Sequence, residues 1–199
     1  MMDMLLSLWL PILLAAVAAW FWSFLSWAIL PIHKNDMKGL PNEDAALAKI
    51  RELGLAPGNY AFPHCDGHKN KNDPAFQAKW KAGPAGMLNV WPANISMGMC
   101  MALSFMVNLL ASVLIAYLLV AAGVPKGAAF VKVMQVAGTA GVLAYTIGWM
   151  PGSIWFQAST NQKVAMLFDG LVVGLGTGAI FAALWPKLAV AGAAITLPG

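Results

Sequence analysis

One aspartate, Asp169, interrupts an otherwise uncharged segment that runs from Val164 to Trp185. A charge inside a membrane span is costly and usually faces a partner group or a water-filled cavity. We expect polar groups at a similar depth and no basic residue at that level; the candidates are Ser104, Tyr145, Thr146, and Ser23 or Ser26. The simpler prediction is a buried acid that bonds to Ser or Tyr and fixes a helix in place. The alternative is an ion, proton or ligand site.

A row of glycines with four-residue spacing follows this aspartate: Gly170, Gly174 and Gly178. Small residues at this spacing let two helix backbones approach closely. The preceding apolar segment carries a similar row of small residues: Ala140, Ala144 and Gly148. We therefore expect these two segments to pack tightly, with Asp169 close to their contact.

The densest group of metal-ligand residue types is the segment HCDGH, with His64, Cys65 and His68 around Asp66. Zinc and copper accept imidazole and thiolate ligands. A second Cys or His pair at finger-like spacing is missing, and His33 is the remaining histidine. Metal or haem binding here is a secondary prediction, and a polar loop tip is the simpler one.

Long apolar runs dominate the chain, which has 199 residues, 60% of them hydrophobic and 10% charged. Soluble domains carry roughly 25% charged residues. About 20 apolar residues cross a bilayer as a helix, because the backbone must satisfy its own hydrogen bonds there. We expect an all-α integral membrane protein with transmembrane helices at residues 1–30, 95–123, 127–149 and 163–186. The first run exceeds a signal-peptide core of about 7–15 residues, so it is expected to remain as an anchor.

The segment 31–94 between the first two spans is expected to be a structured module of short amphipathic helices. Asn42 before two acidic residues, and Asp73 before Pro74, are typical helix starts. The tail 187–199 is apolar but too short to cross the bilayer. We expect it to bury itself in the membrane interface or against another protein.

The positive charges are distributed unevenly between the predicted sides of the membrane. The segment 31–94 holds eight of the twelve Lys and Arg residues. Positive residues near span ends favour the cytoplasm. The distribution therefore predicts a cytoplasmic loop and both termini outside.

Three aromatic residues near the end of the first span, Trp20, Phe24 and Trp27, have the spacing of one helix face. An interfacial aromatic belt or a lipid contact is the simpler interpretation. The alternative is a face that contacts a pigment, a quinone or a partner helix.

Several function classes lack their sequence signals. The chain contains no Walker loop, nucleophile elbow or zinc-protease motif, which favours a protein that is not an enzyme. A net charge of +4 without a dense basic cluster argues against nucleic-acid binding. Two cysteines, Cys65 and Cys100, do not suggest a disulfide scaffold.

Three segments carry a resemblance: LPIHKNDMKGLPNEDA after the first span, GPAGML before the second, and SIWFQASTNQKVAMLFDGL with ALWP at the fourth. Together they resemble a family of small, uncharacterised bacterial multi-pass membrane proteins. The resemblance implies the bacterial inner membrane and includes Asp169 within FDGL. It implies no activity.

The leading prediction is a non-catalytic accessory or scaffold subunit of a larger bacterial membrane complex, with an energy-converting complex, respiratory or photosynthetic, as its expected setting. Lipid and other membrane subunits are the expected partners, and no cofactor is predicted. One alternative is a small oligomeric transporter or channel that uses Asp169. Another is a metal or haem protein that uses His64, Cys65 and His68.

Overall fold

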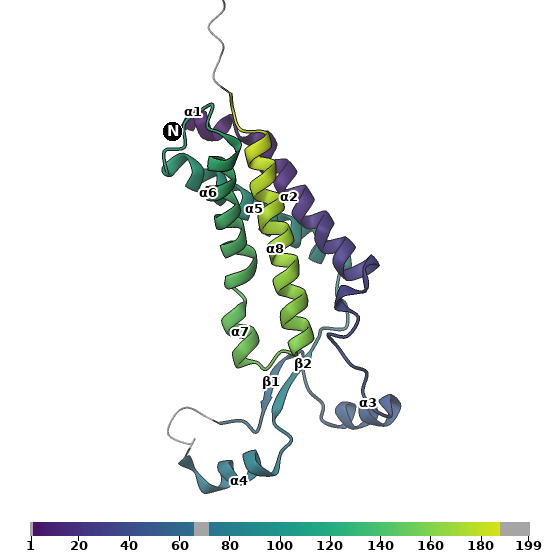
Figure 1. Cartoon of the computed structure of the whole chain (residues 1–199). Coiled ribbons are helices and arrows are strands. Elements are labelled where there is room, and N and C mark those ends of the chain that lie inside the picture. The colour runs from purple at the N-terminus through teal and green to yellow at the C-terminus, as the bar shows by residue number, and fades with distance from the viewer. Residues whose placement is uncertain (1, 66–71, 188–199) are drawn as a thin grey trace, which may run out of the picture. The chain divides into compact units, whose positions relative to one another are not determined.

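The computed structural model describes residues 2–65 and 72–187, and it divides into two compact units (Figure 1). One unit contains the residues up to Met37 and those from Gly98 onward, and the other is Lys38–Met97. Within the described ranges, four helices are long and apolar enough to cross a membrane: Trp9–Ile29, Met97–Ala121, Phe130–Trp155 and Thr160–Ala183. The prediction of a mostly helical chain with four such helices is confirmed.

The first span consists of the helix α2 (Trp9–Phe24) and the π-helical turn η1 (Leu25–Ile29). The short helix α1 (Met2–Leu6) precedes it, and the 3₁₀ turn η2 (Pro31–His33) follows it. In η1 the Leu30 amide donates to the Leu25 carbonyl at 2.8 Å, one residue further back than in an α-helix. Such a bulge inserts one residue into the turn and rotates the side chains that follow it. Single π turns inside helices are frequent at functional sites.

The other three spans have the following bounds: α5 (Met97–Ala121), then α6 (Phe130–Val142) with the π turn η4 (Leu143–Ile147) and α7 (Met150–Trp155), and finally α8 (Thr160–Ala183). Ser159 caps α8 by accepting a hydrogen bond from the Gln162 amide at 3.1 Å. Gly123 and Gly127, both with positive φ, make the tight connection between α5 and α6. The end of α5 and the start of α6 are therefore joined by a short link.

Helix α8 lies between α6 and α2 (Figure 1). Its glycine row contacts α6 and the π turn η4. A Cβ atom at Gly174 would lie 2.5 Å from the Val142 nitrogen, and one at Gly178 would lie 2.6 Å from the Gly138 Cα. A Cβ atom at Gly170 would likewise be too close to the Tyr145 carbonyl oxygen. The backbone of α8 therefore touches that of α6 and η4 along the whole row.

The partner face on α6 differs from the predicted row of small residues. Gly138 and Gly141 face α8, whereas Ala144 and Gly148 are exposed. The predicted row Ala140–Ala144–Gly148 is therefore wrong as the contact face. Small residues occur on two sides of this segment, and the π turn η4 rotates the residues after Val142, so spacing alone does not identify the face.

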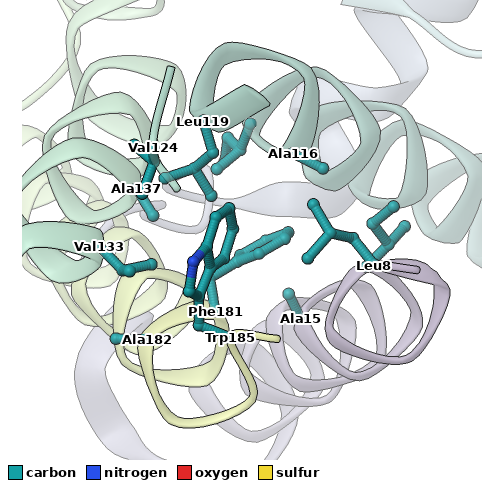
Figure 2. Close-up of a cluster of buried hydrophobic side chains, with 12 residues drawn as sticks. Leu8, Ala15, Ala116, Leu119, Val124, Val133, Ala137, Phe181, Ala182 and Trp185 are labelled. Atoms are coloured by element: carbon teal, nitrogen blue, oxygen red, sulfur yellow. The ribbon is translucent and has the colours of Figure 1, made fainter. Parts of the chain in front are cut away.

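An apolar core fills one end of this unit, and it is drawn in Figure 2. Phe181 and Trp185 project from the fourth span between Leu8, Leu119 and Val133 (Figure 2). The Trp185 indole nitrogen donates to the Pro125 carbonyl at 2.9 Å, which satisfies its polar edge. This end of the unit is packed with apolar side chains.

The second unit is the segment between the first two spans, and its described residues form two helices and two strands: α3 (Glu43–Glu52), β1 (Gly58–Phe62), α4 (Pro74–Ala82) and β2 (Gly86–Val90). The strands pair antiparallel, with Gly58 opposite Val90 and Phe62 opposite Gly86. The all-α prediction misses this sheet, because the two short strands are separated in sequence by a helix and no local hairpin signal joins them.

The predicted helix starts have different outcomes. The Asp73 side chain accepts a hydrogen bond from the Ala75 amide at 3.1 Å, so its predicted cap is confirmed. Asn42 precedes α3 as predicted, but its φ of 48° places it in the left-handed region and its side chain makes no capping bond. The tail beyond Lys187 lies outside the described residues, so its burial stays a prediction.

Candidate functional site: an intramembrane aspartate and its ligands

The Asp169 carboxylate on α8 accepts hydrogen bonds from three side chains of the first span and the turn after it. The Trp22 indole nitrogen lies 3.0 Å from Oδ1, and the His33 Nε2 atom lies 2.8 Å from Oδ2. The Ser26 hydroxyl lies 2.8 Å from Oδ1 and 2.7 Å from Oδ2. Both carboxylate oxygens are therefore bonded within the chain.

The local structure of the first span brings these donors together. Trp22 and Ser26 are four residues apart in sequence, so they lie one above the other on the same helix face. Ser26 sits in η1 and is fully buried. The chain then turns through η2, where Pro31 begins a 3₁₀ turn that places His33 against α8 at Asp169. Two of the three donors therefore depend on irregular turns.

His33 lies between two carboxylates and against an indole ring. Its Nδ1 atom is 2.5 Å from Oδ2 of Asp36, and its ring stacks on Trp27 with centroids 3.9 Å apart and planes 6° apart. The His33 side chain is only 3% exposed. Burial lowers the pKa of His33, but hydrogen bonds to Asp169 and Asp36, together with their charges, outweigh it and raise the pKa above 6.5.

The protonated imidazole donates from both ring nitrogens, so it joins the two carboxylates. We call this group of one imidazole and two carboxyl groups the Asp36–His33–Asp169 cluster. The expectation of no basic partner for Asp169 is wrong. The histidine is visible in the sequence, in the segment HKND directly after the first span. Residue spacing alone does not predict that η2 brings His33 back into contact with Asp169.

The other residues predicted at the depth of Asp169 lie elsewhere. Ser104 is exposed on α5, and its carbonyl accepts from the Asn108 side chain at 2.9 Å. The Tyr145 carbonyl packs against Gly170, and its buried side chain interacts with Ser112 rather than with Asp169. Ser26, one of the hydroxyl residues expected at this depth, bonds Asp169, whereas Ser104 and Tyr145 do not.

The aromatic residues of the first span contact three different neighbours rather than forming one face. The Trp20 indole donates to the Met101 carbonyl at 3.1 Å. Phe24 lies against Phe21, and Trp27 stacks on His33. The π turn rotates Trp27 away from the face predicted by regular helical spacing.

A pocket of about 150 Å³ adjoins the Asp169 carboxylate. Four aromatic residues line it: Trp22, Trp27, Tyr145 and Trp149. The other lining residues are Ser23, Met166, Asp169, Gly170 and Val173. The Asp169 side chain is 17% exposed, so it is accessible although its oxygens are bonded.

No protein-family model, curated protein or solved structure matches this chain. The resemblance to small bacterial multi-pass membrane proteins therefore stays a prediction. Its two most distinctive segments contain the whole cluster, because LPIHKND includes His33 and Asp36 and FDGL includes Asp169.

The predicted metal site is described only in part. His64 and Cys65 follow β1, whereas Asp66 and His68 lie outside the described residues. In the described ranges, no group of three or more His, Cys, Asp or Glu side chains is arranged to hold a metal ion. Metal or haem binding by this loop stays a prediction.

Proposed function

We propose that this chain is a non-catalytic accessory or scaffold subunit of a larger complex in the bacterial inner membrane. The observation that supports the proposal is the surface of α5. None of residues 97–111 is buried, although this half of the helix carries the polar residues Ser104 and Asn108.

Polar side chains in a membrane span usually face another helix rather than lipid. The bond from Asn108 to the Ser104 carbonyl satisfies one amide proton within the helix and leaves the rest of the amide for a partner. Helix α8 carries its buried residues along most of its length, whereas those of α5 begin at Ser112. A transmembrane helix from another protein would cover the first half of α5.

The methionines of this surface also favour a protein partner. Met97, Met99 and Met106 are each more than half exposed. Methionine side chains are flexible and polarizable, and they are common on surfaces that adapt to a partner. The surface therefore suits a helix that packs through side-chain contact.

The Asp169 contacts support a structural function for the buried charge. Three donors from the first span bond its two oxygens, so the carboxylate fixes the end of α2 and the following turn against α8. This is the role of a residue that sets helix register, and no reacting group is required. A scaffold needs such a fixed arrangement of spans.

Proton-linked transport is the second candidate, and the Asp36–His33–Asp169 cluster favours it. A histidine between two carboxylates can pass a proton from one ring nitrogen to the other. The opposite end of the unit is filled by apolar side chains such as Leu119 and Phe181, so the cluster accounts for only part of a path. Transport predicts that Asp169→Asn abolishes proton flux in liposomes while the protein remains folded.

Photo-crosslinking in native membranes tests the scaffold proposal. A photoreactive phenylalanine analogue at Met106 should give an adduct with a different membrane protein, identifiable by mass spectrometry. The same analogue at Val17, an exposed apolar position on α2, is the matched control and should give lipid adducts only. Only lipid adducts at Met106, or an adduct of two copies of this chain, would overturn the proposal.

A further inference from the structure

The pocket beside Asp169 combines aromatic rings with a negative charge, and nothing in the proposed scaffold function explains that combination. Four aromatic side chains from two spans line it: Trp22, Trp27, Tyr145 and Trp149. Aromatic faces attract cations through their quadrupole, and several rings together form the cages that hold quaternary ammonium groups. The lining therefore has the chemistry of a cation site.

The charges around the pocket support the same ligand class. Asp169 lines the pocket directly, and its partner His33 offsets only one of the two carboxylates in the cluster. With both carboxylates ionised, at least one negative charge stays without compensation in either form of the imidazole. A cation next to Asp169 would offset that charge in a region of low dielectric.

The size of the pocket limits the cation that fits. About 150 Å³ equals the share of liquid volume taken by about five water molecules. A trimethylammonium head group, which is a nitrogen with its attached methyl carbons, has a size comparable to that of the pocket. It has no N–H donors, which suits a site whose carboxylate oxygens already accept bonds from Trp22, Ser26 and His33.

The position of the pocket indicates where such a cation would come from. It lies at the end of the first span, where tryptophans gather as they do at the headgroup level of a bilayer. We propose that this pocket binds a quaternary ammonium group, supplied either by a choline lipid headgroup or by a small free molecule.

Equilibrium binding of tritiated choline to the full chain in a maltoside detergent tests this site. Choline should bind saturably, and tetramethylammonium should displace it. The neutral carbon isostere of choline, in which carbon replaces the nitrogen, should displace it at least tenfold more weakly. Absence of saturable choline binding, or equal displacement by the neutral isostere, would overturn the proposal.

Variants at Trp149 distinguish a loss of choline binding from a general loss of folding. Trp149→Leu should weaken choline binding at least tenfold, whereas Trp149→Phe keeps an aromatic face and should retain most of it. Trp155→Leu is the matched control, because Trp155 is 81% exposed and lies outside the pocket. Equal loss in the Leu variants at 149 and 155 would contradict a site at the Asp169 pocket.

Nanodiscs distinguish the two sources of the ligand. If a lipid headgroup fills the pocket, phosphatidylcholine discs should block tritiated choline and phosphatidylglycerol discs should not. If a free molecule is the ligand, choline should bind equally in both discs. Both results support the quaternary ammonium site, and no binding in either disc or in detergent contradicts it.

Discussion

The Nε2 atom of His33 lies 2.8 Å from Oδ2 of Asp169, which joins the turn after the first span to the fourth span. The two residues are 136 positions apart in sequence. Trp27 covers the imidazole ring, and Asp36 bonds its other nitrogen. This contact is the polar counterpart of the apolar core at the other end of the unit.

Removing the hydroxyl of Ser26 should destabilise the protein, because that group is buried and bonds the Asp169 carboxylate. We expect Ser26→Ala to lower the free energy of unfolding by about 1.5–3 kcal/mol, the range for hydrogen bonds to charged groups. Unfolding by a denaturing detergent in mixed micelles measures the change. Ser23→Ala is the control, since Ser23 bonds only the Ala19 carbonyl of its own helix, and an equal loss there would contradict the role of Ser26.

Stability should depend on pH through His33. Its pKa is raised in the folded state, so the protonated imidazole stabilises the fold fully below about pH 6.5, the ordinary value. That contribution is lost as pH rises through the raised pKa. Measured from about pH 6 upward, near the ordinary pKa of histidine, the free energy of unfolding should therefore fall. The His33→Gln variant should show a weaker dependence of this free energy on pH. An unchanged slope in His33→Gln would assign the dependence to another group.

The close contact between α8 and α6 should tolerate no side chain at Gly174. An added Cβ would lie 2.5 Å from the Val142 nitrogen and 2.7 Å from the Gly141 carbonyl carbon. We expect Gly174→Ala to destabilise the protein by about 1–3 kcal/mol through overpacking. Gly176→Ala, on the open side of the same helix, should have no adverse effect, because nothing lies within 4 Å of its added Cβ. Equal stability of the two variants would contradict the observed packing.

The loop between the first two spans should lie in the cytoplasm, as the distribution of Lys and Arg predicts. A single cysteine placed by Glu52→Cys, with Cys65 and Cys100 replaced by serine, reports the side because residue 52 is exposed on α3. A membrane-impermeant maleimide should label it only after spheroplasts are permeabilised. Labelling in intact spheroplasts would show that the loop is outside.

The spans and the tight helix contact were predictable from the sequence, because long apolar runs and four-residue glycine spacing have a direct physical meaning in lipid. Gly170, Gly174 and Gly178 face α6 and η4 for that reason. The partner residues Gly138 and Gly141 were not predicted. Their three-residue spacing gives a weaker pattern than the exposed Ala144 and Gly148.

Asp169 and a serine partner at its depth, Ser26, were predicted from the sequence, but the contributions of Trp22 and His33 were not. The position of His33 depends on the turns η1 and η2, which follow the regular helix. Regular helical spacing does not describe a π turn, so the apparent face Trp20–Phe24–Trp27 was misleading. The strands β1 and β2 were missed because their pairing is not local.

Blue-native electrophoresis of gently solubilised native membranes, followed by mass spectrometry of the band, tests the proposed scaffold function most directly. The chain has a mass of 21.1 kDa, and we expect it in a band well above that mass together with at least one other membrane protein. A band that contains only this chain, at the mass of a monomer, would contradict the proposal.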